Sequence, residues 1–492
     1  MIRLRRTVLA LGTSAALVLA AAPAAHALGP FPEIPARAAG AGALVDQGPF
    51  EIAGGNDAWN ADAQRFSYRS TDSQGRATVD SAIRVTPRTP WTGPGPRPVV
   101  LIAPGTQGMG VKCDPSQAPA AGIGFFGTPP DASLSYEAIF MKDHVDRGAS
   151  VIMIDHHRSL DDGTSQYVDN IASGQSLLDA GVAARELGDA TDAPTAIYGY
   201  SQGGSAAGWA AEHEMTYAPE LNIVAAAAGA PPSDLNAVLD SVDGGLLMGV
   251  LAYAANGVLS KDPELRDEIY NDILNDRGRQ WLDANNEACV VGTILNSGFT
   301  DTRTLTVDGS SLKEVLARFP EITAELERQK LGKGTPAVPT MLYSSVGDDV
   351  IPIGQVRELR DTWQAKGAPL TYVEDQTPMI PGQIAVGHGP ALLANVVQVV
   401  DFLWERLAPA HPGSPIPGVP GSLTPQLPEV PGMPGMPELP GSPSAPGAPG
   451  TPEAPAAPGA PAAPAAPAQA LPALPQQATI PGLPQLQGFG LG

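Results

Sequence analysis

The feature that most constrains the fold is a run of small residues around one serine, Gly199-Tyr200-Ser201-Gln202-Gly203-Gly204. The residues before it, Thr195-Ala196-Ile197-Tyr198, suit a short buried strand, and the alanine-rich residues after it, Ser205 to Met215, suit a helix. A strand that turns directly into a helix needs glycines there, because a Cβ would collide with neighbouring backbone. A G-x-S-x-G spacing in this context predicts an exposed, reactive serine hydroxyl. The alternative is an ordinary surface turn in which Ser201 caps the helix.

The amino terminus predicts export from the cell. Three arginines within residues 3–6 precede an apolar stretch over residues 8–22, and the small-residue run Ala25-His26-Ala27 follows. This pattern is typical of a secretory signal peptide over residues 1–27, cleaved before Leu28. Two of the arginines are adjacent, which leaves both the twin-arginine and the general export route open. No other apolar run is long enough to cross a bilayer, so we expect a secreted, extracellular protein without a transmembrane anchor.

Composition narrows the classes of partner. The chain has 51 Asp and Glu against 29 Lys and Arg, for a net charge of −22. So acidic a protein does not bind nucleic acid or anionic membranes through general electrostatics, and we interpret the charge as a solubility feature. No phosphate loop, zinc-ligand spacing or dinucleotide fingerprint occurs, so we expect no cofactor and no metal. Cys113 and Cys289 can form one bridge in an oxidising compartment, with two buried free thiols as the alternative.

The last part of the chain differs sharply from the rest. Beyond Pro409 the sequence is rich in proline, alanine and glycine, and from Pro431 to Pro467 a proline recurs at every third position. Polyproline II has three residues per turn, and there is no apolar face to bury. We expect residues 409–492 to be a disordered, extended spacer or a stalk associated with the cell wall.

Between residues 28 and 408, short apolar strands alternate with helical patterns, which indicates an α/β domain with a mostly parallel sheet. The expected strands are Val99–Ala103, Val151–Asp155, Ala196–Tyr200, Ile223–Ala228, Thr340–Ser344 and Leu370–Val373, and the expected helices are Gln175–Leu187, Ser205–Met215, Ile353–Lys366 and Ala391–Leu407. Upstream, Arg65–Arg69 and Ala77–Val85 flank the turn at residues 72–75, which predicts an antiparallel hairpin at the sheet edge. This order is that of an α/β-hydrolase.

A helical insertion interrupts the alternation from about Asp234 to Gly332. Its periodic patterns cover Leu265–Leu274, Gln280–Asn286 and Leu312–Arg328, and the run Gly244–Leu259 at its start is strongly apolar. Apolar helices over the mouth of a hydrolase sheet predict a lid or an acyl-chain channel. The alternative, a buried helix of a cap subdomain, is compatible with the first interpretation.

A serine hydroxyl is a poor nucleophile without a base and an orienting carboxylate. In this fold the acid and then the histidine follow the serine along the chain. Of the seven histidines, one lies in the signal peptide, three precede Ser201, His213 lies on the helix leaving the turn, and His411 borders the tail. That leaves His388, in the glycine-bracketed loop at residues 386–390, with a surface-loop histidine as the alternative.

The acid should follow a strand and precede the histidine. Asp348, in the segment at residues 344–352 after the strand at Thr340, is our choice, and Asp349 is the fallback. Asp375, at the end of the next strand, is a weaker candidate. The alternative role for Asp348 is to form a turn or to cap the following helix.

An oxyanion needs two convergent backbone N–H groups. We expect one from Gln202, which follows the serine. The other should come from the turn Pro104-Gly105-Thr106-Gln107-Gly108, where Thr106 is preferred and Gln107 comes next.

With these residues in view, the chain resembles the secretory lipases of the fungal lipase A type, which have actinobacterial relatives. The most distinctive runs are Tyr217-Ala218-Pro219-Glu220-Leu221-Asn222 and Ala228-Gly229-Ala230-Pro231-Pro232-Ser233-Asp234-Leu235, and Gln175-Ser176-Leu177-Leu178-Asp179 also fits. The resemblance covers roughly Gly48 to Leu407. One departure is Asp155-His156-His157-Arg158-Ser159, which replaces the acidic-aromatic and glycine pattern usual after that strand and leaves the local pocket shape open.

The resemblance implies that Ser201, Asp348 and His388 form a catalytic triad. It also implies a helical cap after Leu235 and a disulfide between Cys113 and Cys289.

The sequence therefore predicts a secreted serine carboxylesterase or triacylglycerol lipase that works through an acyl-enzyme. Its expected substrates are esters of medium to long acyl chains, or lipids at a lipid–water interface. The alternatives are a cell-envelope acyltransferase with the same triad and a catalytically silent, wall-associated protein. A cutinase is disfavoured because cutinases lack a helical insertion of this size.

Overall fold

The computed structural model describes residues 35–408, apart from residues 118–122, 127–129 and 135. The predicted signal peptide and the predicted proline-rich tail lie outside the described residues. Within them, no helix combines the length and the hydrophobicity that a membrane span requires.

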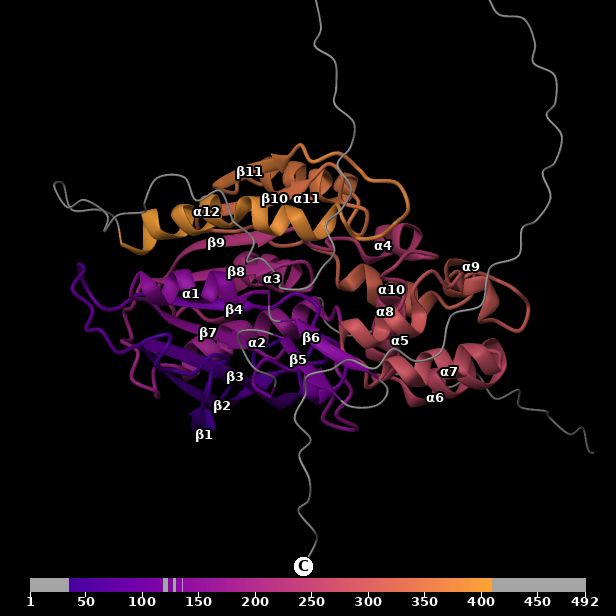
Figure 1. The fold of residues 1–492 in the computed structure, drawn as a ribbon, viewed down its shortest axis with the longest axis horizontal. Helices are drawn as coiled ribbons and strands as arrows, with labels where there is room; N and C mark the ends of the chain where they lie inside the picture. The colour runs from indigo at the N-terminus through magenta and orange to yellow at the C-terminus, as the bar shows by residue number, and fades with distance from the viewer. Residues whose placement is uncertain (1–34, 118–122, 127–129, 135, 409–492) are drawn as a thin grey trace, which may run out of the picture. The chain divides into compact units, whose positions relative to one another are not determined.

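In the described part of the chain, nine strands form one sheet in the order β1-β2-β3-β7-β4-β8-β9-β10-β11 (Figure 1). The strands from β7 to β11 pair in parallel, whereas β1, β2 and β3 pair antiparallel to each other and β3 pairs antiparallel to β7. In spatial order the bounds are Leu44–Phe50, Ala61–Thr71, Ala77–Pro87, Ser150–Ile154, Val99–Ala103, Thr195–Tyr200, Ile223–Gly229, Thr340–Ser345 and Leu370–Asp375. A separate hairpin joins β5 (Ile123–Phe126) and β6 (Asp131–Leu134). The predicted mostly parallel α/β fold is confirmed.

The predicted hairpin of β2 and β3 is confirmed, with Thr71 opposite Ala77 next to the turn, but its predicted place at the sheet edge is wrong. β1 (Leu44–Phe50) pairs outside β2 and forms the edge. Its sequence, LVDQGPF, lacks a clear alternation of apolar and polar residues, because an edge strand on the surface buries little of either face.

The central strands are buried on both faces, as in parallel sheets generally. Along β4, Val99, Leu101 and Ala103 belong to one hydrophobic core, while Val100 and Ile102 belong to another. This division follows from the strand geometry, in which successive side chains point to opposite faces.

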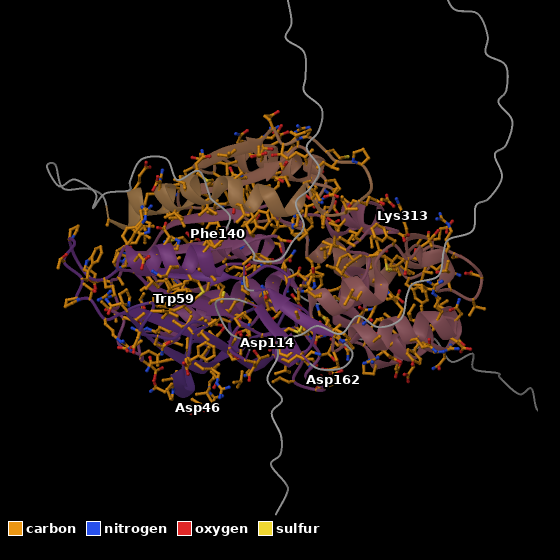
Figure 2. The ribbon with its side chains drawn as sticks, viewed as in Figure 1. Asp46, Trp59, Asp114, Phe140, Asp162 and Lys313 are labelled. Carbon is orange, nitrogen blue, oxygen red and sulfur yellow. A yellow bond between two sulfur atoms is a disulfide. The ribbon has the colours of Figure 1, made fainter. Side chains whose placement is uncertain are left out.

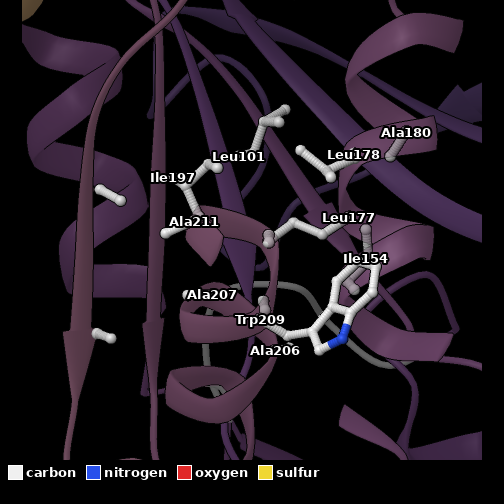
Figure 3. Close-up of a cluster of buried hydrophobic side chains, with 14 of the residues drawn as sticks. Leu101, Ile154, Leu177, Leu178, Ala180, Ile197, Ala206, Ala207, Trp209 and Ala211 are labelled. Atoms are coloured by element: carbon white, nitrogen blue, oxygen red, sulfur yellow. The ribbon is translucent and has the colours of Figure 1, made fainter. Parts of the chain in front are cut away.

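Helices cover both faces of the sheet. Residues of α2, α3 and α11 pack into the first core, where Trp209 of α3 lies close to Leu177 and Ile154 (Figure 3). Residues of α1 and α12 pack into the second core. The bounds are α1 Ala138–Asp146, α2 Asn170–Ala183, α3 Gln202–Tyr217, α11 Ile353–Ala365 and α12 His388–Leu407.

The helices of the insertion pack around a third core and are grouped together at one end of the fold (Figure 1). They are α4 Leu235–Val242, α5 Val250–Leu259, α6 Pro263–Glu268, α7 Asp276–Asn285, α8 Val290–Ser297, α9 Leu312–Leu316 and α10 Pro320–Arg328. The helix predicted over Leu312–Arg328 is two helices, because Pro320 lacks the N–H that a continuous helix needs at that point. Lys313, on α9, lies at the surface of the insertion (Figure 2).

Candidate active site

Ser201 occupies the sharp turn between β8 and α3. Its φ of +56° lies in the left-handed region that non-glycine residues rarely adopt. The glycines around it allow neighbouring backbone to approach closely: a Cβ on Gly199 would lie 2.0 Å from the Gly203 oxygen, and one on Gly203 would lie 1.9 Å from the Ala103 oxygen. The strained turn is therefore held by backbone packing on both sides.

Three side chains from distant parts of the chain meet at this turn. The His388 Nε2 atom lies 2.9 Å from the Ser201 Oγ atom, and His388 Nδ1 lies 2.8 Å from the Asp348 Oδ2 atom. Ser201 is 8% exposed and Asp348 is 2% exposed, so both are buried. The Ser201 side chain makes no capping hydrogen bond to α3, which argues against the alternative of an ordinary helix cap.

His388 is the first residue of α12 and not part of a loop ahead of the helix, as the sequence had suggested. The backbone before it packs tightly, since a Cβ on Gly387 would lie 1.7 Å from the Gly347 oxygen. The Tyr200 hydroxyl donates a hydrogen bond of 2.7 Å to the His388 carbonyl oxygen. The imidazole is thus placed by the start of a long helix and by the residue that precedes the serine.

The two neighbouring aspartates have different roles. The Asp348 Oδ1 atom accepts hydrogen bonds from the N–H groups of Val350 and Ile351, at 3.0 and 2.8 Å, while its Oδ2 atom faces the imidazole. Asp348 therefore makes both predicted contacts: Oδ1 stabilises the turn before α11, and Oδ2 faces the imidazole.

Asp349, the fallback acid, anchors the segment that leads to the histidine. Its carboxylate accepts hydrogen bonds from the N–H groups of Ala385 at 2.8 Å and Gly387 at 3.1 Å. Asp375, the weaker candidate, accepts a hydrogen bond from the Thr377 N–H at 2.7 Å. Of the three aspartates, Asp348 is the one whose carboxylate contacts the ring.

The two expected oxyanion donors border the same cavity as the serine, since Thr106 and Gln202 both line it. Gln202 begins α3, so its N–H has no acceptor within the helix. The N–H of Gly105 is already donated to the Glu137 carboxylate, and the side chain of Gln107 donates to the same carboxylate. Of the two candidates in the turn, Thr106 lines the cavity and Gln107 does not, which favours Thr106 over Gln107 as the donor.

A cavity of about 630 Å³ opens beside Ser201 and His388. Aliphatic side chains from five helices of the insertion line most of its wall. They are Leu235, Val238 and Leu239 of α4, Val250, Leu251 and Val258 of α5, Val290, Val291 and Ile294 of α8, Leu312, Val315 and Leu316 of α9, and Ile322 and Leu326 of α10. Residues 155–159, where the sequence departs from the usual family pattern, do not line this cavity. They therefore do not shape it directly.

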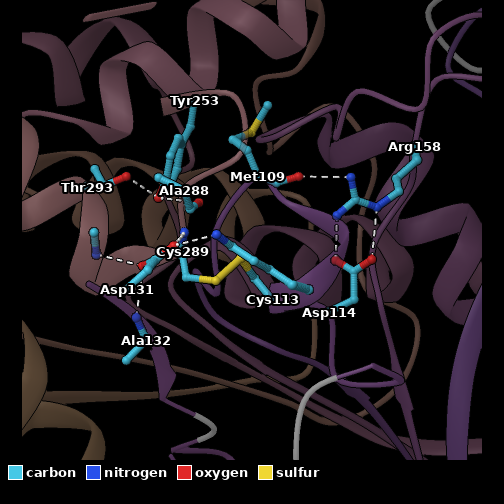
Figure 4. The surroundings of a disulfide bond; sticks show 12 residues. Met109, Cys113, Asp114, Asp131, Ala132, Arg158, Tyr253, Ala288, Cys289 and Thr293 are labelled. Carbon is cyan, nitrogen blue, oxygen red and sulfur yellow. Dashed lines mark hydrogen bonds and ion pairs between the residues drawn. A yellow bond between two sulfur atoms is a disulfide. The ribbon is translucent and has the colours of Figure 1, made fainter. Parts of the chain in front are cut away.

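A disulfide joins Cys113 to Cys289 (Figure 4), so the alternative of two free thiols is wrong. It connects the segment after the turn at residues 104–108, the expected oxyanion turn, to the start of α8. The same connection is reinforced by the Val290 N–H, which donates to the Gln107 carbonyl oxygen at 3.0 Å. The Asp131 carboxylate accepts from the Cys289 N–H at 2.9 Å (Figure 4). One wall of the cavity is thereby fixed to the turn.

Sequence reasoning missed several residues that shape the site. Asp349 was considered only as a fallback acid, and its role in holding residues 385–387 depends on a hydrogen bond between distant segments. Glu137 lies in no motif, and Tyr200 occupies a variable position of the G-x-S-x-G motif, so neither was assigned a role. A buried carboxylate whose hydrogen-bond donors lie about 30 residues away gives no local signal in a single sequence.

Among the described residues, no group of three or more His, Cys, Asp or Glu side chains is placed to hold a metal ion.

Residues 130–408 match the family model of the secretory lipases. The chain is 29% identical over 314 residues to the secreted triacylglycerol lipase LIP4 of Malassezia globosa, an alignment that covers 63% of this chain and 65% of that protein. It is 31% identical over 205 residues to a Mycobacterium tuberculosis protein named a probable inactive lipase, covering 41% of this chain and 45% of that protein. The chain thus spans less than two thirds of the length of these curated relatives.

Solved structures share the fold. The closed state of Candida antarctica lipase A superposes with a TM-score of 0.63 at 20% identity, covering 75% of this chain and 84% of that one. The rice cell wall degrading esterase LipA of Xanthomonas oryzae superposes with a TM-score of 0.57 at 18% identity, covering 73% of this chain and 98% of that one. The fold is therefore that of the α/β-hydrolases, and, with a family match over more than half of its length, the chain belongs to the secretory lipase family.

Proposed function

We propose that this protein is a secreted serine ester hydrolase, a carboxylesterase or triacylglycerol lipase, with Ser201 as nucleophile, His388 as base and Asp348 as the orienting acid. The observation that carries the proposal is the continuous contact from the Asp348 carboxylate through the imidazole to the Ser201 hydroxyl, at 2.8 and 2.9 Å. Ser201 and His388 line an apolar cavity. Family membership and the names of relatives such as the Malassezia globosa triacylglycerol lipase support the same activity.

In the proposed reaction, His388 Nε2 accepts the hydroxyl proton as Ser201 Oγ attacks the ester carbonyl carbon. Asp348 accepts the Nδ1–H hydrogen bond and stabilises the imidazolium. The N–H groups of Gln202 and Thr106 stabilise the oxyanion. The C–O bond to the alcohol then breaks, and the imidazolium gives its proton to the leaving alkoxide. Water, deprotonated by the same imidazole, attacks the acyl carbon; the bond from that carbon to Ser201 Oγ then breaks, the imidazolium returns its proton to Oγ, and the acid is released.

The substrate class follows from the cavity. Its wall is almost entirely aliphatic, and burial of each methylene of an acyl chain in such a site contributes about 0.8 kcal/mol. We infer that medium to long acyl chains extend into the insertion, which serves as an acyl-binding cap or lid. The predicted export signal places the enzyme outside the cell, and residues 409–492 would associate it with the cell wall.

The test is a comparison of S201A with wild-type enzyme on p-nitrophenyl esters from acetyl to long acyl. We expect S201A to be folded but inactive, and wild-type turnover to favour medium to long chains. The matched control is S205A, because the Ser205 hydroxyl is also buried on α3 but donates to Asn170 at 2.7 Å. Wild-type turnover in S201A would contradict the triad, and strict preference for acetyl esters would contradict the proposed role of the cavity.

A catalytically silent protein is the second candidate, favoured by one observation: a relative at 31% identity is named a probable inactive lipase. A fluorophosphonate probe separates the two candidates, because it reacts only with an activated serine. Labelling of the wild type that is absent from S201A would support the enzyme. A wild type that stays unlabelled would support the silent scaffold.

A further inference from the structure

The peptide unit between Pro104 and Gly105, at the start of the oxyanion turn, is held from both sides by buried side chains. Its carbonyl oxygen, on Pro104, accepts a hydrogen bond from His156 Nε2 at 2.7 Å. Its N–H, on Gly105, donates to Glu137 Oε1 at 2.5 Å. Both hydrogen-bonding groups of one peptide are therefore bound by side chains from other segments, which fixes the orientation of its plane.

The rest of the turn is held in a similar way. The other oxygen of the Glu137 carboxylate accepts a hydrogen bond from Gln107 Nε2 at 3.2 Å. The Thr106 hydroxyl and the Tyr167 hydroxyl share a hydrogen bond of 2.6 Å. Glu137 thus contacts the turn on both sides of Thr106, the residue whose N–H is proposed to stabilise the oxyanion.

Glu137 and His156 lie in surroundings that are unfavourable for a charge. Glu137 is fully buried, its hydrogen bonds come from uncharged donors, and burial raises its pKa to about 7. Burial also lowers the pKa of His156 to about 4, so the ring is neutral. Because Nε2 donates its proton to the Pro104 carbonyl oxygen, the neutral ring carries no proton on Nδ1. In keeping with this, Nδ1 has no hydrogen-bond partner among the described residues.

His156 is also strained, because its φ of +64° places a non-glycine residue in the left-handed region. It belongs to the segment in which this chain departs from the usual family pattern. Neither His156 nor Glu137 lines the cavity, so neither touches a substrate there. Strained and poorly solvated groups of this kind persist where the surrounding structure requires them.

We propose that Glu137 and His156 are positioning residues for ester hydrolysis: they fix the Pro104–Gly105 peptide so that the next peptide directs the Thr106 N–H at the oxyanion. This inference rests on the proposed function. An oxyanion donor contributes only when it is aligned with the charge that develops in the transition state. Loss of either contact therefore lowers kcat, whereas substrate binding in the apolar cavity, and so KM, changes little.

The experiment compares variants that remove each contact with variants that retain it. E137M and H156L remove the acceptor for Gly105 and the donor to Pro104. E137Q keeps a carbonyl oxygen for the Gly105 N–H, and H156Q keeps an N–H near the position of Nε2. The readouts are kcat and KM on a p-nitrophenyl ester of medium chain length, normalised to the active sites that a fluorophosphonate probe counts, together with the unfolding temperature.

The matched control is Glu212, another buried carboxylate that accepts two backbone N–H groups, from Gly332 at 2.6 Å and Gly334 at 3.1 Å, and one side-chain N–H, from Trp363 at 2.6 Å. It holds a segment that does not line the cavity. E212M therefore reports the effect of losing a buried carboxylate on stability without disturbing the turn.

We expect E137M and H156L to lower kcat by about 10- to 100-fold, since a small misplacement at the reacting centre costs up to about 100-fold, with KM within about twofold. E137Q and H156Q should recover most of the rate, and E212M should keep wild-type kcat while unfolding at a lower temperature. If E137M does not fold, the H156L and H156Q pair decides the question. Wild-type kcat in H156L, or an equal loss of kcat in E212M, would overturn the inference. An inactive wild type would instead refute the proposed function, and the inference with it.

Discussion

Replacement of Lys261 by methionine should weaken the attachment of the insertion to the α/β domain and destabilise the fold. Lys261 follows α5, and its ammonium lies 2.6 Å from the Asp169 carboxylate, which caps α2, and 2.6 Å from the Glu325 carboxylate of α10. The three side chains are at most 2% exposed. Ser73, in the turn between β2 and β3, also contacts the ammonium at 3.2 Å. The cluster therefore connects two helices of the insertion to two segments of the α/β domain.

The magnitude follows from burial. Removal of one partner from a buried ion pair leaves an uncompensated charge and costs about 3–5 kcal/mol. Here two carboxylates lose their shared cation, and Arg328, which contacts Glu325 at 2.8 Å, remains as partial compensation. We expect K261M to lower the free energy of unfolding by about 3 kcal/mol at neutral pH.

The pH dependence of this loss has a definite sign. Burial raises the pKa of Asp169 and Glu325, but the combined attraction of Lys261 and Arg328, together with hydrogen bonds to the carboxylates, outweighs burial and lowers both pKa values. Carboxylates with lowered pKa stabilise the folded state above their ordinary pKa, and this stabilisation is lost as the pH falls. The difference between wild type and K261M should thus be largest near neutral pH and should shrink below about pH 4.

The measurement is urea unfolding of both proteins across this pH range, monitored by intrinsic fluorescence. The control is K313M, which removes an ammonium that contacts Asp240 at 2.5 Å with both side chains more than 60% exposed. Exposed pairs of this kind contribute about 0–1 kcal/mol. A loss in K261M no greater than that in K313M, or a loss that grows as the pH falls, would refute the reasoning.

Four further predictions concern the site and its frame. D348N should lower kcat by about 10⁴-fold without unfolding the protein, because an asparagine at this position no longer favours the required imidazole tautomer. A decrease of less than tenfold in steady-state kinetics would contradict this prediction. G203A should lower the free energy of unfolding by about 1–3 kcal/mol or more, because its Cβ would lie 1.9 Å from a backbone oxygen; an unchanged urea midpoint would count against the close packing of the turn. Replacement of Cys113 and Cys289 by serine should lower the unfolding temperature, with a loss of up to about 5 kcal/mol, since the bridge spans 176 residues; an unchanged unfolding temperature would contradict this. Burial raises the pKa of Glu137 to about 7, so the wild type should lose stability relative to E137Q as the pH rises from about 4.5 to 7; a constant difference in unfolding temperature would contradict the assignment.

Much of the fold could be predicted because its signals are local. The buried strands around Val99, Ile197 and Leu342 are short apolar runs, and each pattern was placed to within a few residues. The edge strand β1 could not be predicted, since Asp46, Gln47 and Gly48 have little strand preference and their pairing with β2 is a long-range contact. The break before Pro320 was missed because the apolar periodicity continues across it.

The candidate site, like the fold, could be predicted only where the signal lies in consecutive residues or in chain order. Chain order and glycine spacing were enough to select Ser201, His388 and the neighbouring pair Asp348 and Asp349 as candidates from many serines, histidines and acids. The same information could not separate Asp348 from Asp349, which differ only in the direction of the side chain: one carboxylate faces the imidazole and the other accepts the N–H groups of Ala385 and Gly387.

By itself, the sequence determined the α/β alternation, the strained turn at Ser201, the helical insertion and the order of the three candidate catalytic residues. These follow from hydrophobic periodicity and from glycines that the backbone needs, and both are written in consecutive residues. The tertiary structure alone decided which aspartate faces the ring, that Glu137 and His156 bind one peptide of the turn at residues 104–108, and that Lys261 links the insertion to the α/β domain. Such contacts join residues far apart in the chain, and their free energy depends on burial and hydrogen-bond geometry, which exist only once the chain has folded.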